Sequence, residues 1–211
     1  MLVPFLFSAL DLVAKDMVTN GLVLHISYDI ENIAWKQYQG EIVIDRYGRK
    51  KPVPAHGTIK LGKYSASTLL LTEKVLDILD ENDIKATFFI VDYDDNGKKL
   101  IKRALDSGHT IGIHCYDHTY KKIYSSVIEY LKDRDMISQK FYEDFGIRPK
   151  YIRFPGGSAN TVAGEYNNGI MSKIIKLNHD DGYIYYDWNV TSGDGSSLTN
   201  RDMLYNNITS F

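Results

Sequence analysis

Strand-like and helix-like segments alternate along most of this chain of 211 residues. Apolar, β-branched segments at 85–91 and 109–114 have the pattern of buried strands. Segments at 72–80, with Thr72 as the N-cap, and at 125–145 have the spacing of amphipathic helices. Such alternation is typical of parallel strands joined by helical crossovers, in a barrel or an open doubly wound sheet. No glycine-rich phosphate loop opens a helix, which favours the barrel.

Three further segments have the pattern of strands in the same parallel set: 22–28, 151–154 and 182–188. After the first of them, residues 32–63 contain four glycines, two prolines and a short alternating stretch. That composition predicts a hairpin and loops inserted at the rim of the barrel.

The N-terminal segment, residues 2–18, is expected to form a short amphipathic helix that packs on the domain. Its apolar start lacks the positive residues of a signal peptide, although a cropped export signal is the alternative. We therefore expect a helical appendage at 1–20 and one domain at 21–211.

Composition excludes several classes of function. The net charge of −2 and the pI near 6.3 give no electrostatic reason to expect binding to nucleic acid or to an anionic membrane. No apolar run reaches the roughly 20 residues that a membrane span needs. A single cysteine, Cys115, rules out an internal disulfide and leaves the redox compartment open.

His114 and His118 lie four residues apart, immediately after a predicted strand. On a helix or tight turn this spacing brings two imidazoles to one side, where they can share a divalent ion. The pair alone is weak evidence, because a solvated surface turn gives the same pattern. The carboxylates Asp29 and Glu31, which also follow a predicted strand, supply a third ligand of a suitable type.

The segment 108–118 resembles the metal-binding motif of the NodB-like polysaccharide deacetylases, carbohydrate esterase family 4. Residues 85–91 are similar to the strand that precedes this motif in the family. Residues 153–161 and 186–194 are similar to its third and fourth motifs. The match is best to peptidoglycan deacetylases of Gram-positive bacteria. The resemblance implies an α/β fold with a distorted β/α barrel.

The resemblance also implies a divalent metal, with zinc expected and cobalt an alternative, held by His114, His118 and a carboxylate. Arg153 matches the arginine that orients the catalytic carboxylate. The substrate would be a glycan, peptidoglycan or a chitooligosaccharide, and the location extracellular or at the cell wall, with a cytoplasmic location left open. Residues expected to contact substrate are Tyr116, Phe154, Pro155, Gly156 and Trp188, of which Trp188 could equally be core packing.

The family's first motif, which supplies a base and a metal ligand, is displaced in this chain. Its usual register falls on 63–67, where Ser65 and Ala66 can serve neither role. We place the motif upstream, with Asp29 as the general base and Glu31 as the metal ligand, and with the insertion following. An inactive site is the alternative.

The family's last motif, a Leu-His that supplies the general acid, has no counterpart before Phe211. The barrel is therefore expected to be incomplete at its C-terminus. His25 could replace the acid, although a buried strand histidine is the default interpretation. Two classes of function follow: a metal-dependent N-acetyl hydrolase, and a carbohydrate-binding relic of the same fold. An allantoinase-like amidohydrolase is a lesser enzyme alternative.

Overall fold

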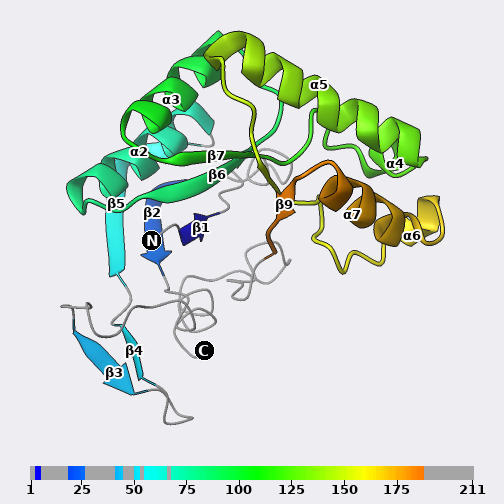
Figure 1. Ribbon diagram of the computed structural model, residues 1–211. Coiled ribbons are helices and arrows are strands. Elements are labelled where there is room, and N and C mark those ends of the chain that lie inside the picture. Colours follow the sequence, from blue (N-terminus) through cyan, green and yellow to red (C-terminus); the bar gives the residue numbers. More distant parts are fainter. Residues whose placement is uncertain are drawn as a thin grey trace. The chain divides into compact units, whose positions relative to one another are not determined.

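The computed structural model, whose helices and strands are labelled in Figure 1, divides by its internal contacts into two compact units. It describes residues 3–5, 19–26, 41–44, 50–52, 55–65 and 68–187. Of these, the first unit contains everything from 19 to 84, and the second contains 3–5 and 85–187.

In the first unit, β2 (Thr19–Ile26) pairs antiparallel with β5 (Ala55–Ser65), and the helix α2 (Thr68–Glu81) contacts both strands. β3 (Ile42–Ile44) pairs antiparallel with β4 (Lys50–Pro52). This pair lies where a hairpin was predicted within residues 32–63, and the place of those residues as an insertion at the barrel rim stays a prediction.

Three expectations for the first unit are wrong. The strand β2 exists, but its partner in the described residues is antiparallel β5 rather than a strand of the parallel sheet. Residues 55–63 belong to β5 although glycines suggested loops, because ladder pairing along the strand offsets the weak strand preference of Gly57 and Gly62. Helix α2 begins at Thr68, so Thr72 lies inside it and is not its cap.

The second unit contains a five-stranded parallel sheet in the order β1-β6-β7-β8-β9. The strands are β1 (Val3–Phe5), β6 (Ala86–Ile90), β7 (Thr110–Ile113), β8 (Tyr151–Ile152) and β9 (Ile184–Tyr185). The helices between them are α3 (Asp95–Asp106), α4 (Tyr120–Ile123), α5 (Val127–Phe145), α6 (Ala163–Tyr166) and α7 (Ile170–Asp180).

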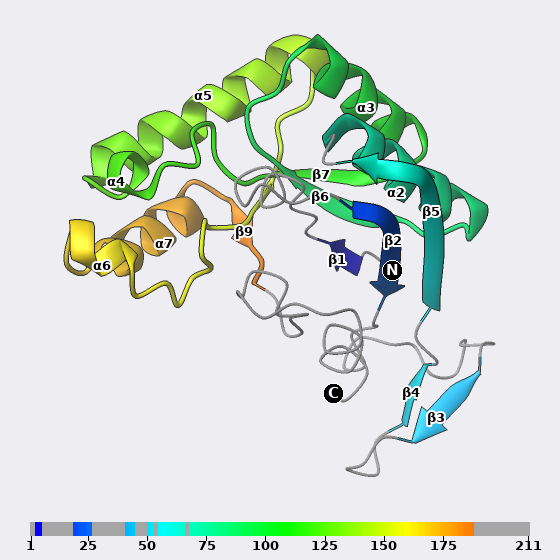
Figure 2. The same cartoon turned by 180° about the vertical axis from the view of Figure 1, so that it is seen from behind.

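The parallel α/β fold class is thereby confirmed. Strands in sequential order, joined by right-handed crossovers, carry their helices on one face, as in a barrel, whereas a doubly wound sheet reverses its order. In both views α3 and α5 lie on the same side of β6 and β7 (Figure 2). The described strands form an open row, and closure into a barrel stays a prediction.

The predicted helix at residues 2–18 is wrong for the residues that the structure describes there. Residues 3–5 form β1, which pairs in parallel with one edge of β6. Proline lacks a backbone N–H, so Pro4 suits β1, which stands at the edge of the sheet among the strands that the structure describes. The remainder of 2–18, and with it the expected boundary at residue 20, lies outside the described residues.

Helix α5 is defined by its ends and by one buried stripe. The Ser126 side chain accepts a hydrogen bond from the Glu129 N–H, and Gly146 ends the helix in the left-handed conformation. These limits confirm the predicted helix to within two residues. The buried stripe carries Tyr130, Asp133, Arg134, Ile137, Ser138 and Phe141. It packs on a core that includes Ile113, Ile152 and Phe154. No helix among the described residues is long and apolar enough to cross a membrane.

Candidate metal centre

His114 and Arg153 follow adjacent parallel strands. His114 is the first residue after β7, and Arg153 is the first after β8. The Arg153 N–H donates to the Ile113 carbonyl at 2.9 Å, which extends the ladder between the two strands. Both residues therefore emerge at the carboxyl ends of the strands, where β/α folds build their active sites.

The two histidines predicted as ligands lie side by side. The Nε2 atoms of His114 and His118 are 3.2 Å apart, and the ring centroids are 5.1 Å apart. Zinc in tetrahedral coordination, at about 2.0–2.1 Å from each nitrogen, separates two ligand nitrogens by about 3.4 Å. The pair therefore fits a shared divalent cation, as the four-residue spacing predicted.

The His114 ring is oriented by the neighbouring strand. Its Nδ1 atom lies 2.7 Å from the backbone carbonyl oxygen of Arg153. Because a carbonyl can only accept, Nδ1 carries the proton, and the lone pair is left on Nε2. Burial lowers the pKa of His114 to about 4, against the opposing effect of this hydrogen bond. The imidazole is therefore neutral near pH 7, as metal binding requires.

Cys115 lies between the two histidines in sequence. Its Sγ belongs to the three-residue group, with His114 and His118, whose ligand atoms all lie within 4.8 Å of one another. The side chain is buried, and burial raises the pKa of the thiol. A neutral thiol is a poor metal ligand, so the two imidazoles are the better donors.

The turn that carries His118 is held by hydrogen bonds. The Asp117 carboxylate accepts from the Thr119 N–H at 3.0 Å and from Lys122 at 2.7 Å. The carboxylate of Asp133, on α5, accepts from the N–H groups of Tyr116 and Asp117 at 2.7 Å each. Asp133 was not predicted from the sequence as a site residue. The sequence signal for Asp133 is that an acidic residue lies on the apolar face of an amphipathic helix, where a buried carboxylate needs hydrogen-bond partners.

Arg153 is buried and points its guanidinium at the end of β9. Its Nε donates to the Tyr186 carbonyl at 3.2 Å, and its NH2 group donates to the Asp187 carbonyl at 3.0 Å. Its Cζ lies 4.7 Å from the centroid of the Phe89 ring, and burial lowers its pKa. The predicted partners of this site, Asp29, Glu31 and Trp188, lie outside the described residues.

Two of the residues expected to contact substrate belong to the core instead. The Phe154 side chain is fully buried, with its ring centroid 6.0 Å from that of Tyr130, so it presents no wall to a sugar. Pro155 is also buried, and its carbonyl accepts from the Tyr124 hydroxyl at 2.6 Å. The sequence alone does not show whether an apolar residue directly after a strand points into the core or toward the substrate side.

Gly156 and Tyr116 remain accessible. Gly156 is exposed with φ of +78°, and Tyr116 is half-buried. A Cβ atom on Gly156 would lie 2.8 Å from the Tyr120 hydroxyl, and the Tyr120 ring centroid lies 5.7 Å from that of His118. Tyr120, which the sequence analysis did not select, therefore lies next to both the histidine pair and the 155–157 loop.

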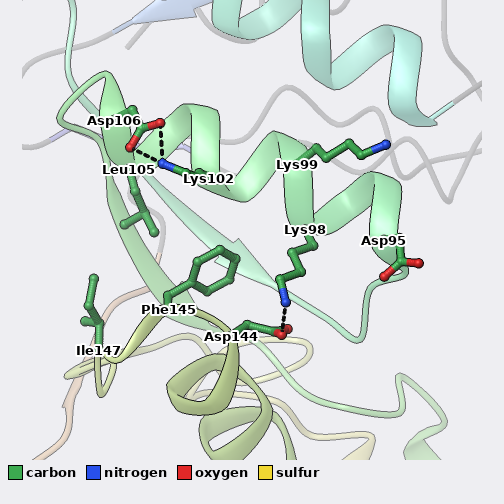
Figure 3. Close-up of a pocket in the computed structure, with 9 residues that line it drawn as sticks. All are labelled: Asp95, Lys98, Lys99, Lys102, Leu105, Asp106, Asp144, Phe145 and Ile147. Atoms are coloured by element: carbon green, nitrogen blue, oxygen red, sulfur yellow. Dashed lines mark hydrogen bonds and ion pairs between the residues drawn. The ribbon is translucent and has the colours of Figure 1, made fainter.

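A separate depression of about 730 Å³ lies along α3 and the end of α5 (Figure 3). Its lysines are mostly paired, Lys98 with Asp144 and Lys102 with Asp106. None of the predicted site residues lines it.

Comparison with known proteins gives the same family. Residues 67–170 match the family model described as polysaccharide deacetylase. A peptidoglycan-N-acetylglucosamine deacetylase of Bacillus cereus is 31% identical over 139 residues, 63% of this chain and 43% of that protein. The peptidoglycan-N-acetylmuramic acid deacetylase of Bacillus subtilis is 26% identical over 139 residues, 63% of this chain and 49% of that protein. This chain thus spans less than half the length of these curated relatives.

Two solved structures are similar in fold. The catalytic domain of a peptidoglycan N-acetylglucosamine deacetylase from Eubacterium rectale is 34% identical, with a TM-score of 0.62 over 66% of this chain and 64% of that one. A polysaccharide deacetylase from Bacillus cereus is 27% identical, with a TM-score of 0.51 over 65% of this chain and 63% of that one. The segment 67–170 of this chain thus matches the polysaccharide deacetylase family, and the fold is similar to that of the NodB-like deacetylases of carbohydrate esterase family 4.

Proposed function

We propose that this chain is a metal-dependent hydrolase that removes N-acetyl groups from a polysaccharide containing N-acetylglucosamine, with peptidoglycan as the favoured substrate. One observation carries the proposal: the Nε2 atoms of His114 and His118 lie 3.2 Å apart at the carboxyl ends of the parallel strands. Relatives that act on peptidoglycan support the substrate class. A glycan of the cell wall implies a location outside the cell or at the wall.

His114 and His118 would hold the metal, with Glu31 as the third protein ligand from the motif match. Zinc is expected, and cobalt is a workable substitute. A divalent ion bound there supplies a Lewis acid that polarises the acetyl carbonyl and activates a water molecule. The Nδ1–H form of His114 leaves the Nε2 lone pair available, so His114 would bind a metal through Nε2.

Asp29 and Arg153 complete the proposed mechanism. In this proposal the Asp29 carboxylate accepts the proton of the attacking water, and the Arg153 guanidinium holds that carboxylate ionised and in place. The backbone carbonyls of Tyr186 and Asp187 fix the guanidinium. The exposed Gly156 and the half-buried Tyr116 are the proposed substrate contacts among the described residues.

The test is acetate release from peptidoglycan and from chitooligosaccharides, with Zn²⁺ or Co²⁺ supplied to metal-free protein. His114→Ala should abolish both stoichiometric zinc and acetate release. Asp29→Asn should retain zinc and lose acetate release by about 10²–10⁴-fold, the usual worth of a general base. His179→Ala is the matched control, because that imidazole is exposed on the surface at the end of α7.

The outcome separates the possible functions. Zinc binding without acetate release from either glycan at any metal loading would overturn the deacetylase and favour a carbohydrate-binding relic. Hydrolysis of a small cyclic amide in place of the glycans would favour the allantoinase-like alternative. Zinc retained by His114→Ala would remove the proposed metal centre.

A further inference from the structure

The Asp133 carboxylate lies in the interior and bonds to the backbone of the histidine turn. Asp133 is 8% exposed, on the buried stripe of α5. Its Oδ2 accepts from the Tyr116 N–H and its Oδ1 from the Asp117 N–H, each at 2.7 Å. These short distances are typical of hydrogen bonds to an ionised acceptor, which are about twice as strong as neutral ones.

The two ligand histidines are fixed by different parts of the fold. The His114 N–H donates to the Ile90 carbonyl at 2.8 Å, so the sheet ladder fixes His114 directly. His118 lies four residues further on, is exposed, and belongs to no strand that the structure describes. The position of His118 relative to the sheet therefore depends on the backbone of Tyr116 and Asp117. Both of their N–H groups donate to the Asp133 carboxylate.

We infer that Asp133 is a positioning residue for the metal centre: its carboxylate fixes the backbone of Tyr116 and Asp117 so that the His118 ring meets the His114 ring. This inference rests on the proposed function, because the turn at Tyr116 and Asp117 matters only if His118 binds a metal. Asp133 touches neither imidazole and acts through the turn. Outer contacts of this kind are typically worth about 10- to 100-fold in metal affinity.

The test is Asp133→Asn, which keeps the size of the side chain but replaces one acceptor by an NH₂ group facing a backbone N–H. Zn²⁺ is titrated into metal-free protein and the heat of binding is measured. We expect binding about 10- to 100-fold weaker than that of the unchanged chain. The matched control is Asp135→Asn on the same helix, whose side chain is 62% exposed and pairs with Arg134. Arg134 keeps its Asp181 partner in that variant, and zinc affinity should not change.

A second measurement uses no metal. Amide hydrogen exchange of the unchanged chain should show slow exchange at Tyr116 and Asp117. In Asp133→Asn these two amides should exchange faster, and the nuclear Overhauser contact between the His118 and Tyr120 rings should weaken or vanish. That ring contact, 5.7 Å between centroids, reports where His118 lies.

The results distinguish the two proposals. Equal zinc affinity of Asp133→Asn and the unchanged chain would overturn the positioning role while leaving the metal centre intact. Failure of the unchanged chain to bind zinc would overturn the metal centre, and the exchange and ring-contact data would still decide the role of Asp133. Fast exchange at Tyr116 and Asp117 in the unchanged chain would overturn the positioning role, whether or not the variant folds.

Discussion

The Nδ1 atom of His114 lies 2.7 Å from the backbone carbonyl oxygen of Arg153, so one strand selects the tautomer of a histidine on its neighbour. In metal-free protein near pH 7 we expect His114 to carry its proton on Nδ1. Long-range ¹⁵N–¹H correlation spectra of the imidazoles measure this directly. The exposed His179 serves as reference and should show the tautomer mixture of a solvated ring. A His114 protonated on Nε2 would contradict the geometry.

Gly156 is expected to tolerate no side chain. A Cβ there would lie 2.6 Å from the Asn160 amide nitrogen, at a φ of +78° that L-residues rarely adopt. Gly156→Ala should lower the free energy of unfolding by about 1–3 kcal/mol, measured by urea denaturation. Gly146→Ala is the control, because Gly146 has a φ of +69° with open space around its Cβ position. The loss at Gly156 should exceed the loss at Gly146, and equal losses would remove the steric part of the explanation.

Ile152 on β8 is fully buried in the core of the second unit. Ile152→Ala should cost about 2–5 kcal/mol of unfolding free energy through lost burial and the cavity left behind. Ile128→Ala, on the exposed side of α5 at 65% exposure, should cost less than about 1 kcal/mol. Thermal and urea denaturation measure both variants. Similar losses in the two would mean that β8 is not part of the core.

The Asp144 carboxylate joins the two helices that flank the depression of Figure 3. It accepts hydrogen bonds from Lys98 and from the Tyr93 hydroxyl. The pKa of Asp144 is lowered, and the hydrogen bond from Lys98 is the largest cause. A lowered folded pKa means stability that is complete above the ordinary aspartate pKa, near 4, and that is lost as the pH falls through the folded value. Asp144→Asn should cost up to about 1 kcal/mol near pH 7.

The pH dependence checks the origin of that loss. The difference in urea midpoint between Asp144→Asn and the unchanged chain should shrink as the pH falls below about 4. It should also shrink in high salt, because the pair is partly exposed. A difference that is constant from pH 7 to pH 3 would assign the loss to packing and not to charge.

Local chemistry predicted much of the second unit. Its parallel strands and the extent of α5 follow from hydrophobic spacing, which acts over a few residues. The juxtaposition of His114 and His118 also followed from spacing, because both lie in one turn.

Local sequence patterns could not predict how segments that are distant in the sequence pair with one another. Strand β5 forms where two glycines suggested loops, since its stability comes from the ladder with β2, whose paired residues lie 29 to 46 positions away in the sequence. The contact of Asp133 with Tyr116 and Asp117 likewise depends on how α5 docks on the sheet, which no short pattern encodes. The burial of Phe154 depends on that docking as well.

The hydrogen bond from the Arg153 N–H to the Ile113 carbonyl has a consequence for how such chains can diverge. Because the β7–β8 ladder sets the separation of His114 from Arg153, the part of the crossover that follows Asp133 can gain or lose helical turns without altering it. Insertions and deletions in this part of the crossover should be common among functional homologues. Changes of even one residue between Ile113 and His118 should be rare.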